Sequence, residues 1–395
     1  MDIQTKLLQD YTNNQYPLNM RRIAERLHML GQIGMTKNGG SNRVAHSLED
    51  EKGRFLIKEW MEQIDLEFFT DEQGNQFGIW HGENPELPVF MMGSHTDTVP
   101  NGGHFDGALG VIIGLEVIHF LQQHHIQPRR SLVISNFSDE EGVVSGEGLT
   151  GSNYFLAAAE QGKHMIALPK DFFEVHIEQG KVLEHHNLAV GIVESIVALT
   201  NLQVTFKGKA DHAGTTPMFL RKDPILAASE WILKVNHLTR SFDQHAVATA
   251  GRTLIVPNAT NVIPEEVQVF IDIRLAQTER LKQLVVILQK TAQEIAKTHQ
   301  IEIEMNNPVI TNGAQMNANL CNQLHAICED LNIPVMNLLS GAAHDALVLA
   351  QKVQATMLFI RSQDGISHHP DEWSNLDDIE YAFTIALHFV RKQIV

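Results

Sequence analysis

Histidine and aspartate side chains follow the apolar segment 88–92, which has the composition of a short buried strand. His95 and Asp97 come first, and their spacing of two places both side chains on one face of an extended backbone. Asp106 follows after a glycine-rich loop, and an apolar helix is expected over residues 108–123. Active sites of α/β folds lie at the carboxyl ends of strands, so this order of residues is typical of one. A surface histidine beside an acid is also ordinary, and this stretch alone leaves a metal site and a solvated surface equally open.

Two further strand-like segments end in the same residue types. Residues 131–137 lead to three consecutive acids, 139–141, which are costly to hold together unless water or cations surround them. A solvated loop is the simpler interpretation of that run when it is taken in isolation. Residues 172–177 contain His176 close to their end. Because these strands alternate with helical segments, we predict an α/β fold with a mainly parallel sheet and helices on both faces.

The pattern changes at about residue 199, which indicates a second domain. Residues 223–238 have helical spacing, with Asp223 as N-cap and a proline at the first helical position. Residues 267–275 alternate as a half-buried strand, and residues 278–298 form an amphipathic helix. Together these segments describe a two-layer α+β unit of small-domain size, after which the first pattern resumes. We therefore predict a catalytic domain from residues 1–198 and 308–395, interrupted by an inserted domain over residues 199–307.

The composition excludes several classes of protein. A chain of 395 residues is too long for one typical core, and its net charge of −17 argues against nucleic acid or anionic membrane as a partner. Two cysteines provide no disulfide framework. The most apolar run, 107–115, is too short to span a bilayer, and the first residues lack a signal-peptide pattern. We expect a soluble cytoplasmic protein.

Five candidate ligands offer nitrogen or oxygen donors and no thiolate: His95, Asp106, Glu141, His176 and His368. Such a set suits Zn²⁺ or Mn²⁺ in a carboxylate-bridged pair better than a structural zinc. Asp106 is well placed in the sequence to contact both ions. Glu140 lies beside a ligand but points to the other side of the chain, so it is available as a general base. Asp97 is the expected partner for the second ring nitrogen of His95.

The chain resembles the amidohydrolases of the M20 peptidase clan, in particular the group of N-carbamoyl-L-amino-acid hydrolases, ureidopropionases and allantoate amidohydrolases. Eight motifs carry this resemblance, and they occur in order over residues 93–374: GSHTDTVPNGGHFDG, SDEEG, HIEQG, DHAGTTPM, NVIP, DIR, SGAAHDA and GISHHPDEWS. The resemblance implies a di-metal catalytic domain with an inserted lid and dimerisation domain, and a homodimer joined through that insert. It also implies two divalent ions held by the five ligands, with Zn²⁺ preferred and Mn²⁺, Co²⁺ or Ni²⁺ as alternatives.

The resemblance further assigns roles to individual residues. Glu140 is implied as the base, and His212 as the group that polarises the scissile carbonyl. The implied contacts to the substrate are Asn261 and Arg274 for its carboxylate, with Gln179 and His344 completing the pocket. Three of them have a simpler alternative that the residues alone favour: Arg274 pairs with Asp272 on its own strand face, His212 caps a turn, and His344 packs under the sheet. The strand carrying Arg274 follows the loop of Asn261, so the two side chains are expected to meet at one anion.

The implied reaction is hydrolysis of the ureido C–N bond of an N-carbamoyl amino acid, ureidopropionate or allantoate, with release of ammonia and carbon dioxide. Alternatives are a di- or aminopeptidase of the same clan, or a ligand-binding relative without catalysis. An intact ligand set together with Glu140 argues against the latter. The sequence departs from the family at 143–145, where relatives often carry an arginine and a phenylalanine. It also departs at 198–201 and at Ala343, so the choice among ureido substrates stays open.

Overall fold

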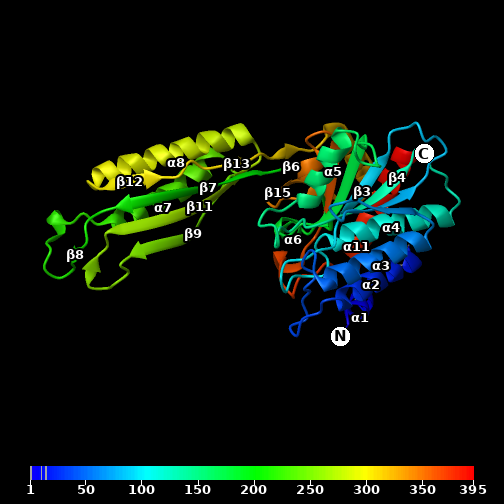
Figure 1. The fold of residues 1–395 in the computed structure, drawn as a ribbon, viewed down its shortest axis with the longest axis horizontal. Helices are drawn as coiled ribbons and strands as arrows, with labels where there is room; N and C mark the ends of the chain where they lie inside the picture. Colours follow the sequence, from blue (N-terminus) through cyan, green and yellow to red (C-terminus); the bar gives the residue numbers. More distant parts are fainter. Residues whose placement is uncertain (1, 10, 14–15) are drawn as a thin grey trace. The chain divides into compact units, whose positions relative to one another are not determined.

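The computed structural model describes residues 2–9, 11–13 and 16–395, and the chain divides into two compact units (Figure 1). Unit 1 comprises Met1–Glu194 and Gln315–Val395, and unit 2 comprises Ser195–Ala314. Unit 2 is continuous in sequence and is inserted into unit 1, and it contains the segment 199–307. Among the described residues, no helix has the length and apolar composition needed to cross a membrane.

Unit 1 contains a nine-stranded mixed sheet whose central strands are parallel. The central order is β4 (Leu132–Phe137), β3 (Phe90–His95), β5 (Asp171–Ile177) and β16 (Gln354–Ile360). Antiparallel pairing begins on both sides of this centre, where β2 pairs with β4 and β6 with β16. The outer strands are β1 (Glu67–Thr70), β2 (Gln76–Trp80), β6 (Val190–Ile196), β14 (Ala314–Gln315) and β15 (Val335–Ser340). The predicted α/β class with a mostly parallel central sheet is confirmed.

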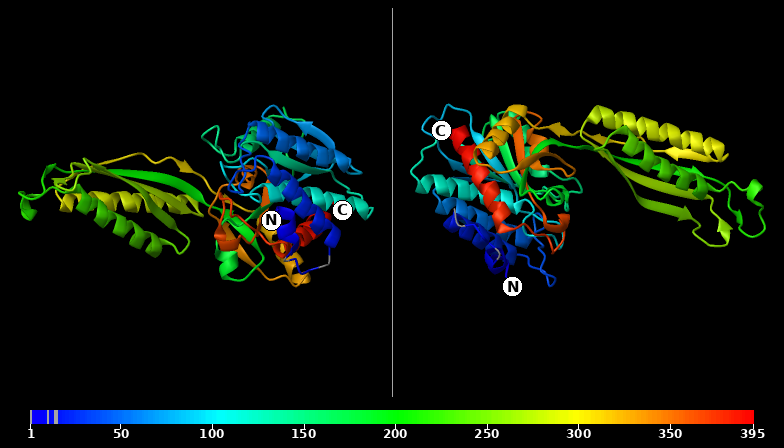
Figure 2. Two further views of the ribbon diagram at one scale, coloured as in Figure 1. Left: turned by 90° about the horizontal axis from the view of Figure 1, so that it is seen from below. Right: turned by 180° about the vertical axis from the view of Figure 1, so that it is seen from behind.

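Helices cover the central strands, which explains why these strands are buried along their whole length. Every residue of β3, β4 and β5 is buried, as expected for parallel strands that are shielded on both faces. Helix α4 (Ala108–Gln123) packs on β3, β4 and β5, and α11 (Leu376–Ile394) packs on α4 and β16 (Figure 2). The other helices of unit 1 are α1 (Ile3–Gln9), α2 (Pro17–Gln32), α3 (Leu48–Gln63), α5 (Thr150–Glu160), α6 (Val182–His185), α9 (Ala318–Asp330) and α10 (Asp345–Leu349).

Unit 2 is a two-layer structure with its own core. Its antiparallel sheet has the order β12-β7-β11-β9, and alternate residues of β11 (Glu266–Leu275) are buried under α7 (Pro224–Phe242) and α8 (Thr278–Thr298). The Asp223 side chain accepts the predicted capping hydrogen bond at the start of α7. The remaining strands are β7 (Ala198–Lys207), β8 (Asp211–His212), β9 (Val247–Val256), β10 (Val262–Ile263), β12 (Glu302–Met305) and β13 (Ile310–Thr311), and β8 pairs with β10 in a separate ribbon.

Several elements were not anticipated from the sequence. Helix α5 begins within the glycine-rich run 145–151, where propensity argues against a helix. Strand β9 is a sheet edge whose residues are mostly exposed, so its sequence lacks the apolar alternation that reveals a half-buried strand.

Candidate metal centre

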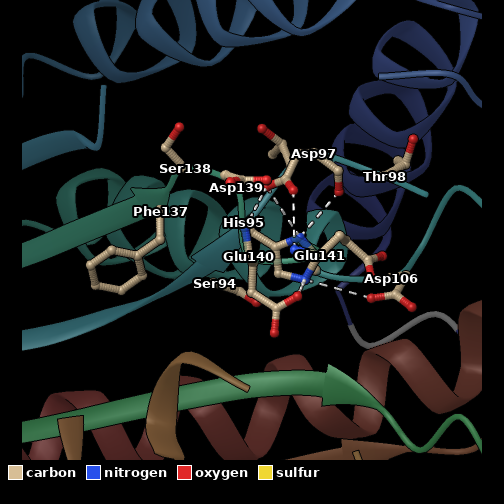
Figure 3. A network of polar contacts seen from close by, with 12 residues as sticks. Ser94, His95, Asp97, Thr98, Asp106, Phe137, Ser138, Asp139, Glu140 and Glu141 are labelled. Atoms are coloured by element: carbon tan, nitrogen blue, oxygen red, sulfur yellow. Dashed lines mark hydrogen bonds and ion pairs between the residues drawn. The ribbon is translucent and has the colours of Figure 1, made fainter. Parts of the chain in front are cut away.

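The ligand-type side chains lie where the central parallel strands end (Figure 3). His95 is the last residue of β3, and His176 is the next-to-last residue of β5. Glu140 and Glu141 follow β4 after Asp139, whose left-handed backbone (φ 52°) turns the chain. His368 lies in the loop after β16. The parallel register brings these ends to one edge of the sheet, as the sequence pattern predicted.

Asp106 is shared by two groups of side chains that could each hold a metal ion. His95, Asp106 and His176 form the first group, and Asp106, Glu141 and His368 form the second, with the ligand atoms of each group within 4.8 Å of one another. Oδ1 of Asp106 faces the first group, at 3.1 Å from Nε2 of His176 and 3.6 Å from Nε2 of His95. Oδ2 faces the second, at 3.3 Å from Nε2 of His368. One carboxylate can therefore bridge two ions.

Backbone carbonyls orient the two histidines of the first group. Nδ1 of His95 lies 3.1 Å from the carbonyl oxygen of Asp97, and Nδ1 of His176 lies 2.9 Å from that of Ile177. When Nδ1 carries the proton that donates to the carbonyl, Nε2 presents a lone pair toward Asp106. Burial lowers the pKa of His95 to about 4 against the opposing effect of Asp106, so its ring is neutral at pH 7.

Asp97 has a different contact from the expected one. Its carbonyl, rather than its carboxylate, is the nearer partner of His95, because the carboxylate oxygen lies 3.7 Å from Nδ1. The carboxylate instead accepts long hydrogen bonds from the backbone N–H groups of Glu140 (3.4 Å) and Glu141 (3.3 Å). Asp97 thus ties the end of β3 to the acidic turn after β4.

The centre concentrates negative charge in a buried place. Burial, with Asp106 as the next cause, raises the pKa of Glu141 to about 8. Burial together with Asp345 and Glu141 raises the pKa of Glu140 well above its usual range. In the described part of the chain, the ion-pair partners of Asp106, Glu140 and Glu141 are histidines rather than lysines or arginines. Buried carboxylates need compensating positive charge, so the donor set and its charge fit two divalent cations.

Glu140 and Glu141 face different groups, as their adjacent positions predicted. Oε2 of Glu141 lies 3.3 Å from Nε2 of His368, within the second group. Oε2 of Glu140 lies 3.5 Å from Nε2 of His95, and Glu140 belongs to neither group of candidate ligands. A carboxylate beside the centre that is not needed as a ligand is free to move a proton.

The two groups differ in exposure. The side chains of His95 and His176 are each 1% exposed, whereas the side chain of His368 is 48% exposed. The first group is therefore enclosed by protein, and the second opens to solvent at His368.

Glycine at position 107 is required by the packing of the centre. Its backbone is left-handed (φ 61°), and a Cβ there would overlap the ring of His95. Helix α4 begins at the next residue, so the chain turns from the bridging aspartate directly into the helix.

Additional polar groups hold Asp106, and the sequence interpretation missed two of them. Nε2 of Gln179 (2.7 Å) and Oγ of Ser367 (2.9 Å) both donate to Oδ2 of Asp106. Gln179, expected to contact substrate, thus also contacts the bridging carboxylate. Glu372 accepts hydrogen bonds from the backbone N–H groups of Phe105 and Asp106. Ser367 and Glu372 both lie in the motif GISHHPDEWS, close to the candidate ligand His368.

His344 has the packed position that the simpler alternative described. It is 2% exposed, its Nε2 lies 2.9 Å from Oγ of Ser340, and its ring centroid lies 4.4 Å from that of His176. It lies against a candidate ligand, so a substrate contact at His344 would occur next to the first group.

In unit 2, the simpler local contacts of the predicted substrate residues are also present. Nδ1 of His212 accepts a hydrogen bond from the backbone N–H of Gly214 (2.9 Å), so His212 caps a turn. Arg274 donates to both carboxylate oxygens of Asp272, at 2.8 and 3.1 Å. At His212 the turn involves Nδ1 and leaves Nε2 outside this contact, so it does not exclude a substrate role.

Asn261 and Arg274 lie toward opposite ends of β11, contrary to the expectation that they meet at one anion. The β8–β10 ribbon lies beyond the Glu266 end of the strand (Figure 1). Asn261 directly precedes β10, and its carbonyl accepts a hydrogen bond from the backbone N–H of Ala213. From Glu266 to Arg274 is eight residues of strand, roughly 26 Å. Within one chain, a single carboxylate therefore cannot contact both side chains.

Comparison with known proteins places the chain among hydrolases. Residues 91–392 match the sequence profile described as Peptidase family M20/M25/M40. An N-carbamoyl-L-amino-acid amidohydrolase from Pseudomonas sp. (strain NS671) is 34% identical, with 92% of this chain and 95% of the relative covered. An allantoate amidohydrolase from Escherichia coli (strain K12) is 32% identical, with coverages of 92% and 96%. The crystal structure of an amidase of the hydantoinase/carbamoylase family from Burkholderia multivorans is 28% identical, has a TM-score of 0.90, and covers 95% of this chain and 98% of that one.

Proposed function

The chain belongs to Peptidase family M20/M25/M40, and we propose that it is a metal-dependent amidohydrolase that cleaves the ureido C–N bond of an N-carbamoyl-L-amino acid or a close relative such as ureidopropionate or allantoate. The observation that carries this proposal is the pair of ligand groups that share Asp106, with Glu140 beside them and outside both. Ammonia and carbon dioxide are the expected products besides the amino acid.

Two divalent ions are the proposed cofactors. His95, Asp106 and His176 would hold one ion, and Asp106, Glu141 and His368 the other. The donors are imidazole and carboxylate without thiolate, so Zn²⁺ is preferred, with Mn²⁺, Co²⁺ or Ni²⁺ as alternatives. When bound, such ions lower the pKa of a water molecule toward about 7 and polarise a carbonyl oxygen.

Glu140 is the proposed general base. Its carboxylate takes the proton of the attacking water, and the hydroxide adds to the ureido carbonyl carbon. Glu140 then returns the proton to the leaving nitrogen as the C–N bond breaks, so the residue is restored at the end of the cycle. The carbamate that forms decomposes to ammonia and carbon dioxide. Because Glu140 is only 8% exposed, bulk water competes little for the proton.

Residues of unit 2 are proposed to recognise the substrate. The turn at His212 supports its role, because an Nδ1 that accepts a backbone hydrogen bond leaves the proton of the neutral ring on Nε2, where it can donate to a carbonyl oxygen. Arg274 presents a planar fork that matches a carboxylate, and Asn261 is a second polar group for the same substrate class. Gln179 supports binding through its Oε1, which is buried and has no hydrogen-bond partner among the described residues.

The proposed homodimer is joined through unit 2. Strand β9 lies at the end of the path β12-β7-β11-β9, is ten residues long, and exposes Val247, Leu254 and Val256. A long apolar edge of this kind is a surface for pairing with another chain. Sedimentation should give a dimer at micromolar concentration, and a monomer there would contradict the proposal.

Metal-dependent release of ammonia from a panel of substrates tests the proposed function. The panel contains N-carbamoyl amino acids, ureidopropionate, allantoate and dipeptides, each assayed with metal-loaded and chelator-treated protein. Turnover of a ureido substrate that depends on metal supports the proposal. Turnover of dipeptides alone would indicate a peptidase of the same family, and no turnover by protein with both metals bound would indicate a relative that lacks catalysis.

A further inference from the structure

The backbone that carries the bridging aspartate is held by a carboxylate from a distant part of the chain. Oε1 of Glu372 accepts hydrogen bonds from the N–H groups of Phe105 (2.9 Å) and Asp106 (3.1 Å). These residues precede α4 by only two or three positions, and their N–H groups are not used by a helix or strand ladder. The position of Asp106, which both ligand groups require, therefore depends on Glu372.

The second oxygen of Glu372 contacts the loop that carries His368. Oε2 lies 2.9 Å from Oγ of Ser367, and the same hydroxyl lies 2.9 Å from Oδ2 of Asp106. Ser367 directly precedes the ligand His368. One carboxylate thus connects the loop after β3 with the loop after β16, which are more than 260 residues apart in sequence.

The packing around Glu372 is close and specific. The residue is 2% exposed, and a Cβ at Gly103 would overlap its carboxyl group. Among the described residues, Glu372 accepts hydrogen bonds from two backbone N–H groups, lies 2.9 Å from one hydroxyl, and has no lysine or arginine at ion-pair distance. A buried carboxylate without a cationic partner contributes little to stability by itself, so a role in placing other groups explains it better.

We propose that Glu372 is a positioning residue of the metal centre, which sets the bridging geometry of Asp106 by clamping the backbone of 105–106 to the loop of Ser367 and His368. This inference rests on the proposed function, because it presumes that Asp106 binds both ions. Groups that orient metal ligands in this way change metal affinity by about 10–100-fold when they are removed.

The test measures Zn²⁺ binding by competition with a chromophoric chelator for the parent, Glu372→Ala and Glu372→Gln. Alanine removes the acceptor of both backbone N–H groups, and we expect its Zn²⁺ dissociation constants to rise by about 10–100-fold. Glutamine keeps a carbonyl oxygen that can accept both hydrogen bonds, so we expect it to stay within about threefold of the parent. Asp371→Asn is the matched control, because Asp371 is the next residue in sequence and its side chain is 76% exposed.

Kinetics at saturating Zn²⁺ provide a second reading of the same variants. Glu372 acts on the bridging ligand and has no expected contact with substrate, so kcat of Glu372→Ala should fall while KM stays within about threefold. Circular dichroism and the melting temperature of the metal-free proteins establish that each variant is folded. If Glu372→Ala fails to fold, Gly103→Ala tests the same contact, because its Cβ displaces the carboxyl group.

Two results would overturn the inference. The first is that the folded Glu372→Ala variant, or Gly103→Ala in its place, binds two Zn²⁺ ions with the affinity of the parent. The second is an equal loss of Zn²⁺ affinity in Glu372→Ala and Glu372→Gln, which would mean that the charge of Glu372 rather than its hydrogen bonds supports metal binding. A different result would contradict the proposed function: the parent protein binds two Zn²⁺ ions and hydrolyses no ureido substrate.

Discussion

Replacing Glu140 with glutamine separates catalysis from metal binding more cleanly than any other single change in this protein. Glutamine has nearly the same shape and cannot take a proton at neutral pH. Glu140 belongs to neither ligand group, although its Oε2 lies 3.5 Å from Nε2 of His95. We therefore expect Glu140→Gln to keep two equivalents of metal and to lose nearly all turnover.

The magnitude follows from the role of the group. A general base contributes roughly two to four orders of magnitude to rate, which corresponds to about 2.7–5.5 kcal/mol in the activation barrier. Glu140 lies among Glu141, Asp97, Asp106 and Asp345, whose negative charges oppose its ionisation. Glutamine is neutral and fills the same space, so the variant should fold as well as the parent. Lost activity would then not reflect lost structure.

The assay is ammonia release from an N-carbamoyl amino acid, together with metal analysis of the same preparation. Glu147→Gln is the control, because this exposed acid lies in the same loop and has no contact with the centre. Turnover by Glu140→Gln within about tenfold of the parent, with full metal content, would refute the assignment of Glu140 as the base. Loss of metal from the variant would instead show that Glu140 is a ligand.

Three further predictions test separate features of the protein. Asp106→Ala should lose both metal equivalents, because the two groups share this residue, whereas His368→Ala should keep about one in the enclosed group. Metal analysis after desalting distinguishes these results, and equal losses would contradict the bridging arrangement. Arg274→Lys should lower kcat/KM for carbamoyl amino acids by an amount equivalent to a rise on the order of 2–4 kcal/mol in the activation barrier, and it should spare a carbamoyl amine without a carboxylate. An equal fall for both substrates would mean that the pair of Arg274 with Asp272 maintains the fold. Burial raises the pKa of the Cys328 thiol to about 12, so this thiol should react with a disulfide reagent at pH 8 only after unfolding; rapid labelling of the native protein would show that the α9 packing is wrong.

The sequence alone predicted the fold class and the chemistry of the centre. Apolar segments of strand length alternate with helices, so a mostly parallel sheet was expected and is present. The alternation of residues 267–275 predicted which face of β11 is buried. Histidines and acids near the ends of the strands made His95, Asp106, Glu141, His176 and His368 candidates, and the family resemblance implied that they come together. These features are local, because periodicity and residue type are properties of short stretches of chain.

Local patterns failed where the environment decides the conformation. Helix α5 follows glycines that disfavour helices, and β9 lies at an edge where exposure removes the apolar alternation. Asn261 and Arg274 do not meet within one chain for a related reason. Nearness in sequence suggested that they would, but an extended strand carries its two ends roughly 26 Å apart.

Tertiary structure alone decided how the shared aspartate, Asp106, is oriented. Oδ1 of Asp106 faces His176 and Oδ2 faces His368 because the end of β5 and the loops after β3 and β16 converge on one carboxylate. Glu372 holds that arrangement across more than 260 residues of sequence, and the carbonyl of Ile177 sets the ring of His176. Residue type determines which atoms can bind a metal, but the distances among those atoms depend on contacts between segments that are remote in the chain, and no local pattern encodes them.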